Sequence, residues 1–147
     1  MFIVDESDRR IYNYPFYTFK LSFIIKLWLI SFVKKTLKVY ATEDGKEPYT
    51  EWLENFKDYT IRSRIIRRIE RLKQGNYGDC KSVGDGVLEL RFFFGSGYRV
   101  YFGESANDLV ILLCGGDKDS QDKDIEKAKK YWQAYQEEQD EQETEKP

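Results

Sequence analysis

The stretch from Lys81 to Lys118 decides the fold of this 147-residue chain. It reads K-S-V-G-D-G-V-L-E-L-R-F-F-F-G-S-G-Y-R-V-Y-F from Lys81 and, after a short loop, ends in L-V-I-L-L-C-G-G-D-K. Aliphatic and aromatic runs bounded by glycine are typical of strands. We therefore expect three strands, at Val87–Phe94, Gly97–Gly103 and Leu109–Cys114. The third is apolar on both faces, which favours an interior position in the sheet.

The glycine turn predicts the register of the first hairpin. Gly95-Ser96-Gly97 suits a three-residue loop in which Gly97 takes the left-handed conformation. This loop places apolar pairs on one face of the sheet: Phe94 with Tyr98, Phe92 with Val100, and Leu90 with Phe102. A two-residue loop would put Arg99 among these core residues, where an unpaired charge is costly. We therefore favour the three-residue loop.

The opposite face of the same hairpin carries cations. Because side chains alternate along a strand, Arg91, Arg99 and Tyr101 are expected side by side, with Phe93 opposite Arg99. Such a cluster is unusual on a sheet face that serves only folding, so the pattern indicates a surface with a function.

Composition excludes several kinds of chemistry. The chain has no histidine, which removes Ser-His-Asp and Cys-His nucleophiles and histidine-ligated zinc. Its two cysteines, Cys80 and Cys114, lack metal-ligand spacing and indicate a reducing compartment, so we expect a cytoplasmic protein without a cofactor.

Charge is unevenly distributed along the chain. The net charge is −2, yet residues 61–101 hold nine basic and four acidic side chains, while residues 136–147 hold six acids and one lysine. A local surplus of positive charge suggests an anionic partner, either nucleic acid or an acidic protein surface. The competing interpretation is a solvated helix face.

The remaining chain predicts three segments. Residues 1–36 form an apolar extension, residues 37–135 form the folded domain, and residues 136–147 form a disordered acidic tail. Within the extension, Phe16–Val33 is nearly long enough to span a bilayer, but Lys20 and Lys26 interrupt it, each at a cost of roughly 2.5–3.5 kcal/mol. We expect no stable membrane association. A membrane anchor and an element added to the core remain alternatives to a segment that is not translated in the functional protein.

The domain itself reads as a strand, two helices, three strands and a helix. Leu37–Ala41 is a short strand, and Pro48 suits the first position of a helix. A second helix has an apolar stripe from Ile61 to Leu72 with arginines on the other side. Residues 76–86 read as a loop, and Ser120 can cap a last helix running to about Tyr135. The fold class is α+β, with a two-helix hairpin and a C-terminal helix packed on a mainly antiparallel four-stranded sheet.

Several motifs carry a resemblance. They are P-x-x-x-W-L from Pro48, R-L-K-Q-G-N-Y-G-D from Arg71, G-Y-R-V-Y-F from Gly97 and L-L-C-G-G-D-K-D-S-Q from Leu112. In this order and spacing they resemble the RelE/ParE superfamily of small bacterial toxins, most closely the branch of addiction-module killer proteins that are phage Gp49-like or HigB-like. The resemblance covers about two thirds of the chain and implies a small RelE-like fold.

The resemblance also implies a function. Such toxins pair with a cognate antitoxin, here expected to be a helix-turn-helix, HigA-like protein. RelE-type members enter the ribosome and cut mRNA without a metal, using the 2′-hydroxyl of the RNA as nucleophile. ParE-type members instead inhibit DNA gyrase, and an inactive relic is a third alternative.

The residues for RNA cleavage follow from the same resemblance. Lys81 is the candidate base for the 2′-hydroxyl, and Arg91, Arg99 and Lys118 are the candidate groups that stabilise charge on the phosphate. Tyr101, Phe93, Arg68 and Arg71 are the candidate RNA contacts. Asp124 stands where RelE-like proteins carry a tyrosine. The competing interpretation pairs Arg91 with Glu89 or Asp117, and the cleavage hypothesis requires cations that the protein's own carboxylates do not neutralise.

Overall fold

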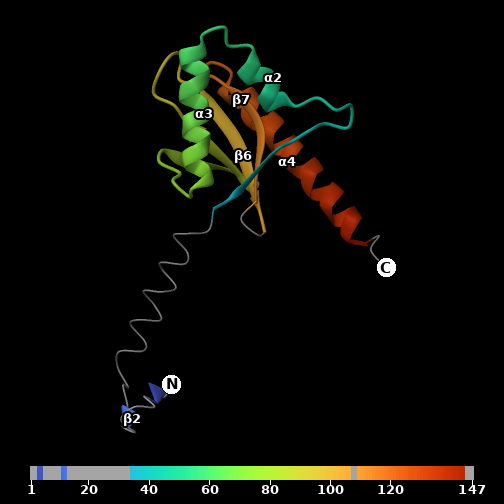
Figure 1. Cartoon of the computed structure of the whole chain (residues 1–147). Helices are drawn as coiled ribbons and strands as arrows, with labels where there is room; N and C mark the ends of the chain where they lie inside the picture. The colour runs from blue at the N-terminus through green and yellow to red at the C-terminus, as the bar shows by residue number, and fades with distance from the viewer. Residues whose placement is uncertain (1–2, 5–10, 13–33, 107–108, 145–147) are drawn as a thin grey trace. The chain divides into compact units, whose positions relative to one another are not determined.

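The protein is seen as a computed structural model that describes residues 3–4, 11–12, 34–106 and 109–144 (Figure 1). The chain divides into two units, residues 1–33 and 34–147. In the first unit, β1 (Ile3–Val4) pairs with β2 (Ile11–Tyr12) in antiparallel fashion. The alternatives considered for Phe16–Val33 concern residues outside the described part. Among the described residues, no helix has the length and apolar character needed to cross a membrane.

The second unit is built on a five-stranded sheet in the order β3-β7-β6-β5-β4. The strands are β3 (Thr36–Val39), β4 (Cys80–Gly84), β5 (Val87–Arg91), β6 (Arg99–Ser105) and β7 (Leu109–Gly116). β3 runs parallel to β7, and the other neighbours are antiparallel. The α+β class and the interior position of the third predicted strand, β7, are confirmed.

The sheet has one strand more than predicted. β4 lies in the segment that reads as a loop and pairs with β5 through a tight turn at Asp85-Gly86. Both turn residues have positive φ, 53° and 79°, the combination that a two-residue hairpin loop requires. The Asp-Gly dipeptide is the signal for this hairpin, and the prediction of a loop there is wrong.

Three helices cover the two faces of the sheet. α2 (Pro48–Glu54) begins with its proline, and α3 (Tyr59–Lys73) begins after Asp58, whose carboxylate accepts a hydrogen bond from the Thr60 N–H at 2.7 Å. The side chains of α2 and α3 pack in one core with Leu90, Phe92, Val100 and Phe102. α4 (Gln121–Thr144) packs in a second core on the opposite face (Figure 1).

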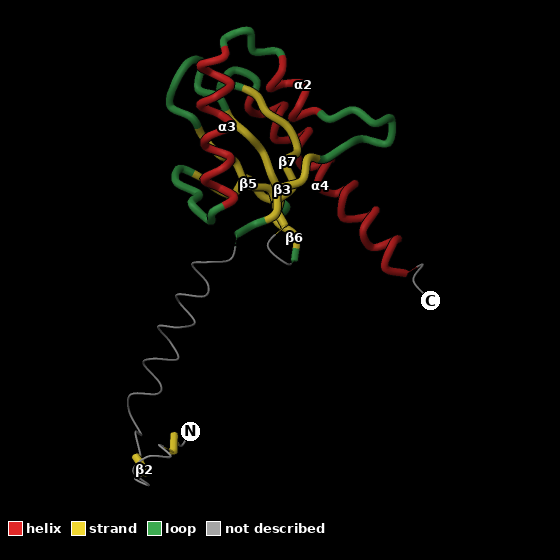
Figure 2. The backbone as a smooth tube through the Cα atoms, viewed as in Figure 1, coloured by secondary structure: helices red, strands yellow, loops and turns green. Residues whose placement is uncertain are grey.

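α4 is longer than predicted. It continues through Thr144, so the prediction of a disordered tail is wrong for residues 136–144, and residues 145–147 lie outside the described part. The added turns are rich in Glu and Gln, which are good helix formers, and Gln133 donates to Glu137 one turn later at 2.8 Å. Figure 2 shows this half of α4 beside the loop between β3 and α2, with which it lines a hollow.

The register of the central hairpin differs from the prediction by two residues. Leu90 pairs with Val100, and Arg91 pairs with Arg99. The connecting loop is therefore longer than three residues: the Phe92 N–H donates to the Tyr98 carbonyl at 2.9 Å, which leaves residues 93–97 as the loop. Phe94 and Tyr98 pack edge to face, with 5.6 Å between their ring centroids. A shift of two residues keeps every side chain on its predicted face. The face assignment is confirmed although the pairs are wrong.

Gly103 on β6 lies against α4 with no room for a side chain. A Cβ at this position would overlap the indole ring of Trp132 from α4. We expect Gly103→Ala to lower the free energy of unfolding by about 1–3 kcal/mol through overpacking. Urea denaturation measures the change, and a variant as stable as the wild type would contradict the close packing of α4 on β6.

Candidate functional site

Two adjoining hollows lie where β5 passes into the loop that leads to β6. The larger, about 430 Å³, is lined by Arg64, Arg67, Arg68, Arg71, Asp79, Arg91 and Phe92–Phe94. The smaller, about 300 Å³, shares Arg91 and Phe92–Phe94 with it and adds Gly95, Gly97, Tyr98, Arg99 and Lys118. We call the two hollows together the basic groove. Seven basic side chains and one carboxylate line it, a net charge of +6.

α3 supplies four of these cations as a single stripe. Arg64, Arg67, Arg68 and Arg71 follow the i, i+3, i+4, i+7 spacing of one helix face, while Ile65 and Ile69 are buried on the other. Burial and then the charge of Arg71 lower the pKa of Arg68 below its ordinary value. Arg68 and Arg71 were predicted as RNA contacts. Arg64 and Arg67 were not, although the helical spacing of the arginines was available as a signal.

Phe93 projects from the groove between its two hollows. Its side chain is 82% exposed, the largest such value among the exposed large hydrophobic residues of the described part. The guanidinium carbon of Arg91 lies 6.0 Å from its ring centroid, and that of Arg64 lies 3.8 Å from the ring centroid of Phe94. The groove thus offers an open aromatic face among cations, the combination that single-stranded nucleic acids use for stacking and phosphate contact.

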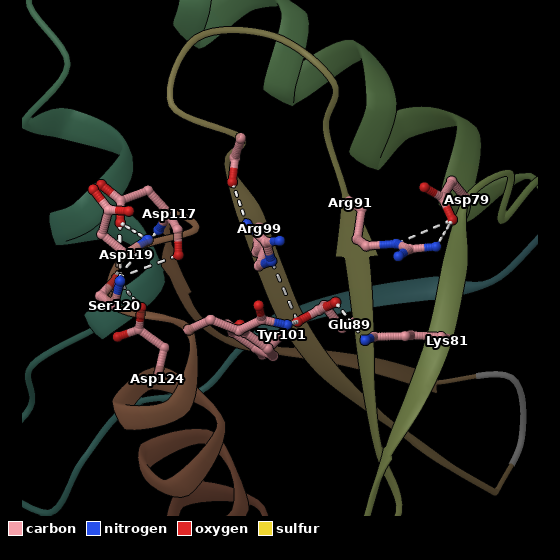
Figure 3. Close-up of polar contacts among 12 residues, drawn as sticks. Asp79, Lys81, Glu89, Arg91, Arg99, Tyr101, Asp117, Asp119, Ser120 and Asp124 are labelled. Atoms are coloured by element: carbon pink, nitrogen blue, oxygen red, sulfur yellow. Dashed lines mark hydrogen bonds and ion pairs between the residues drawn. The ribbon is translucent and has the colours of Figure 1, made fainter.

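Arg91 is paired with an acid that the sequence did not indicate. Its Nε and terminal nitrogen donate to Oδ1 of Asp79 at 3.1 and 2.5 Å (Figure 3). The hydrogen bond to Asp79 raises the pKa of the Arg91 guanidinium. Neither Glu89 nor Asp117, the partners considered from the sequence, forms an ion pair with Arg91. The pair stays partly open to solvent, with 36% of the arginine side chain and 28% of the aspartate exposed.

Glu89 forms a second charged centre, next to Arg99 and Lys81. Its carboxylate is fully buried, and its oxygens lie 3.5 Å from Arg99 Nε and 3.7 Å from Lys81 Nζ. Tyr101 donates its hydroxyl to Glu89 at 3.1 Å. Figure 3 shows Glu89 between Arg99 and Tyr101 on one side and Lys81 on the other.

These contacts correct two sequence-based predictions. Arg91, Arg99 and Lys81 each face a carboxylate of the protein, so the prediction of unneutralised cations is wrong for three of the four candidate catalytic residues. Tyr101 is fully buried, and burial followed by the charge of Glu89 raises its pKa, so its ring is not open to an RNA base. Core packing of α4 against the sheet covers this tyrosine.

Lys118 differs from the other three candidates. It is exposed, and within the described residues no carboxylate lies within 4.0 Å of its amine. Its backbone N–H donates to Ser96 at 3.4 Å, which places it beside the hairpin loop. The smaller hollow therefore brings Arg91, Arg99 and Lys118 together, whereas Lys81 lines neither hollow.

Asp124 is turned into the protein instead of the groove. It is buried, and it accepts a hydrogen bond from the Ser120 hydroxyl at the start of α4. In the part of the chain that is described, no group of three or more Cys, Asp or Glu side chains could hold a metal ion.

Comparison with known proteins identifies the family. Residues 51–133, more than half of the chain, match the phage-derived Gp49-like proteins (DUF891), and every lining residue of the basic groove falls in this span. The chain belongs to this family, as the sequence motifs predicted. An uncharacterized protein of Haemophilus influenzae is 53% identical over 81 residues, which is 55% of this chain and 82% of that protein. The wider relation to the RelE/ParE superfamily stays a prediction.

Proposed function

We propose that the protein is the toxin of a type II toxin–antitoxin system and that its basic groove binds RNA. The observation that carries the proposal is the composition of the groove: seven cations and one carboxylate surround the exposed ring of Phe93. Phosphates bind the cations, and an unstacked base packs on the ring. Membership in the Gp49-like family supports a toxin-like role. In this proposal the protein acts in the cytoplasm on mRNA at the ribosome.

The ion pairs of the groove leave room for a phosphate. Pairs between partly exposed side chains contribute little to stability, so a phosphodiester can compete with Asp79 for Arg91 at small cost. Arg91 also keeps one terminal nitrogen that donates to no described residue. Lys118, Arg67 and Arg71 lack a carboxylate within 4.0 Å in the described part of the chain and are open to a phosphate directly.

The cleavage hypothesis requires cations that no carboxylate neutralises, so it now depends on Lys118 and on the terminal nitrogens of Arg91 and Arg99 that donate to no described residue. The RNA's 2′-hydroxyl loses its proton to water and its oxygen bonds to the adjacent phosphorus. The P–O5′ bond breaks, which leaves a 2′,3′-cyclic phosphate, and the departing 5′ oxygen takes a proton from water. Arg91, Arg99 and Lys118 face the same hollow and would stabilise the charge that develops on the phosphate. Lys81 lines neither hollow and faces the carboxylate of Glu89, so in this proposal solvent water, and not Lys81, accepts the 2′-hydroxyl proton.

The direct test is to induce the protein in cells and map the 5′ ends of mRNA. We expect growth to stop and new ends to appear within coding sequences. Intact messages during growth arrest would count against RNA cleavage and direct attention to another target.

Phe93→Ala is expected to weaken binding of a short single-stranded RNA by about 1–3 kcal/mol, because one base loses its stacking platform. The side chain is exposed, so the free energy of unfolding should stay within about 0.5 kcal/mol of the wild type. Fluorescence anisotropy measures the affinity. Phe93→Trp is the matched control and should keep the wild-type affinity. Equal affinity of the wild type and both variants would show that Phe93 does not contact the RNA.

One observation favours the ParE-like alternative, inhibition of DNA gyrase through the helical hairpin of α2 and α3. Tyr59 and Ile66 on α3 are 80% and 44% exposed, and their spacing of seven residues places them on the same face of the helix, where a partner protein would contact both. Formation of a cleaved complex between gyrase and supercoiled DNA would support this alternative. A toxin without that effect on gyrase would leave RNA as the proposed target.

The proposed partner is the cognate antitoxin, a helix-turn-helix, HigA-like protein. An acidic segment of such a protein would neutralise the basic groove and block RNA at the same time. The acidic residues near the end of α4 do not take this place, because Glu137, Glu138 and Glu141 line a hollow with the loop between β3 and α2.

A further inference from the structure

A fully buried carboxylate lies at the centre of the candidate catalytic groups. Glu89 is on β5, and its oxygens face Lys81 on β4, Arg99 and Tyr101 on β6, and Gln121 at the start of α4. Burial of a carboxylate is costly unless its charge is compensated. An apolar side chain would fill this position of the sheet at a lower cost in free energy. We therefore expect the buried acid to have a functional role.

The contacts of Glu89 divide into two kinds. Neutral donors fix one oxygen, since Oε2 accepts from the Tyr101 hydroxyl at 3.1 Å and from Gln121 Nε2 at 2.9 Å. The cations stand further away, with Arg99 Nε at 3.5 Å and Lys81 Nζ at 3.7 Å. Both Glu89 Oε1 and Arg99 Nε are buried without a hydrogen bond. Neutral groups therefore hold the carboxylate in place. It attracts and orients the two cations, but their N–H groups form no hydrogen bond with it and stay available.

Arg99 has little freedom in this arrangement. Its side chain is 13% exposed, one terminal nitrogen donates to the Gly97 carbonyl at 2.5 Å, and its Nε faces Glu89. The remaining terminal nitrogen is left for a ligand in the smaller hollow, which Arg99 lines. An arginine that is fixed before the ligand arrives loses less entropy on binding and stabilises charge more effectively.

We infer that Glu89 is the positioning residue of the site, an inference that rests on the proposed function. It holds the guanidinium of Arg99, the proposed charge stabiliser, in a fixed orientation at the smaller hollow, and it faces Lys81 on the neighbouring strand. The arginine stripe of α3 does not contact Glu89. Loss of the buried charge should therefore slow cleavage and leave the binding of RNA nearly unchanged.

The test compares Glu89→Gln with Gly103→Ala, which destabilises the same sheet on β6 without touching Glu89. Steady-state cleavage of a single-stranded RNA should show a fall in kcat of about a hundredfold for Glu89→Gln with KM within about threefold. Gly103→Ala, measured below its melting temperature, should keep both constants. A fall confined to KM, or an equal fall for both variants, would overturn the inference because it would report binding or stability alone.

A second readout does not depend on RNA. In the wild type, the side-chain N–H of Arg99 should give a resolved NMR signal that exchanges slowly with solvent. In Glu89→Gln its exchange should be faster by about tenfold or more, because the group that orients it is gone. An unchanged Arg99 signal would overturn the inference whatever the kinetics show. A wild type that cleaves no RNA but shows this change would refute the proposed function and leave the positioning of Arg99 intact.

Gln121→Ala keeps the experiment possible if Glu89→Gln does not fold. Gln121 is partly exposed and donates one of the two hydrogen bonds that fix the carboxylate. Its removal should raise the exchange of the Arg99 N–H and lower kcat in the same direction by a smaller factor. A variant with wild-type values for both would overturn the inference.

Discussion

Arg91→Ala is expected to abolish the growth arrest that induction of the wild-type protein causes and to lower the rate of RNA cleavage by about 10²–10³-fold. Loss of one preorganised charge at a site of developing negative charge has an effect of this size. Arg91 lines both hollows of the basic groove, so its removal affects binding and chemistry together. Growth curves after induction and single-turnover cleavage of a short RNA measure the two effects.

Asp79→Asn is the matched control for this prediction. It breaks the same ion pair from the other side and leaves the Arg91 guanidinium free for phosphate. We expect this variant to keep the growth arrest and to bind RNA at least as tightly as the wild type. If Arg91→Ala folds and still arrests growth, or if Asp79→Asn loses activity as fully as Arg91→Ala, the pair matters for structure and the role of Arg91 is wrong.

The double variant Arg67→Ala/Arg71→Ala is expected to reduce the salt dependence of RNA binding. Each phosphate contact on a single strand contributes about 0.7 to the slope of log affinity against log salt. Removal of two should lower the slope by about 1.4 and weaken binding at low salt without sequence preference. Anisotropy titrations at several salt concentrations measure the slope.

Lys123→Ala/Lys130→Ala supplies the comparison of equal charge. Both lysines are exposed on α4 and line neither hollow of the groove. Their removal changes net charge by the same amount as the arginine double variant, and we expect the slope to stay at its wild-type value. An equal change for the two double variants would mean that overall charge attracts the RNA and that the groove is not its site.

The sequence predicted faces more reliably than it predicted pairs. Alternation placed Arg91 and Arg99 on one face correctly, because a register error of two residues does not change the side on which a residue points. The pairing itself depended on the length of the loop, which is residues 93–97 because the Phe92 N–H donates to the Tyr98 carbonyl at 2.9 Å, and the glycine positions alone did not reveal this length. The missing prediction of β4 has a different cause: the Asp85-Gly86 hairpin signal lies among other glycine and aspartate residues that are equally typical of a loop.

The sequence singled out several residues that the structure brings together, but it did not predict the carboxylates that pair with the cations. Four residues singled out from the sequence, Phe93, Arg68, Arg71 and Lys118, line the basic groove, and their role in binding RNA stays a prediction. A carboxylate partner of Arg91 was considered from the sequence, but Glu89 and Asp117 were named instead of Asp79. Asp79 meets Arg91 only because β4 and β5 form a hairpin. Pairing between residues far apart in the sequence decides which cations lack a carboxylate partner. This pairing depends on the fold and cannot be predicted from local spacing.

The measurement that tests the central claim most directly is an NMR titration of the full chain with a short single-stranded RNA, read at the backbone amides. The account predicts that the amides of Arg67, Phe93 and Lys118 shift together with a common affinity, while those of Glu137 and Glu141 on the far half of α4 do not. Binding that shifts no amide of the groove, or no binding at low salt, would contradict the assignment of the basic groove to RNA.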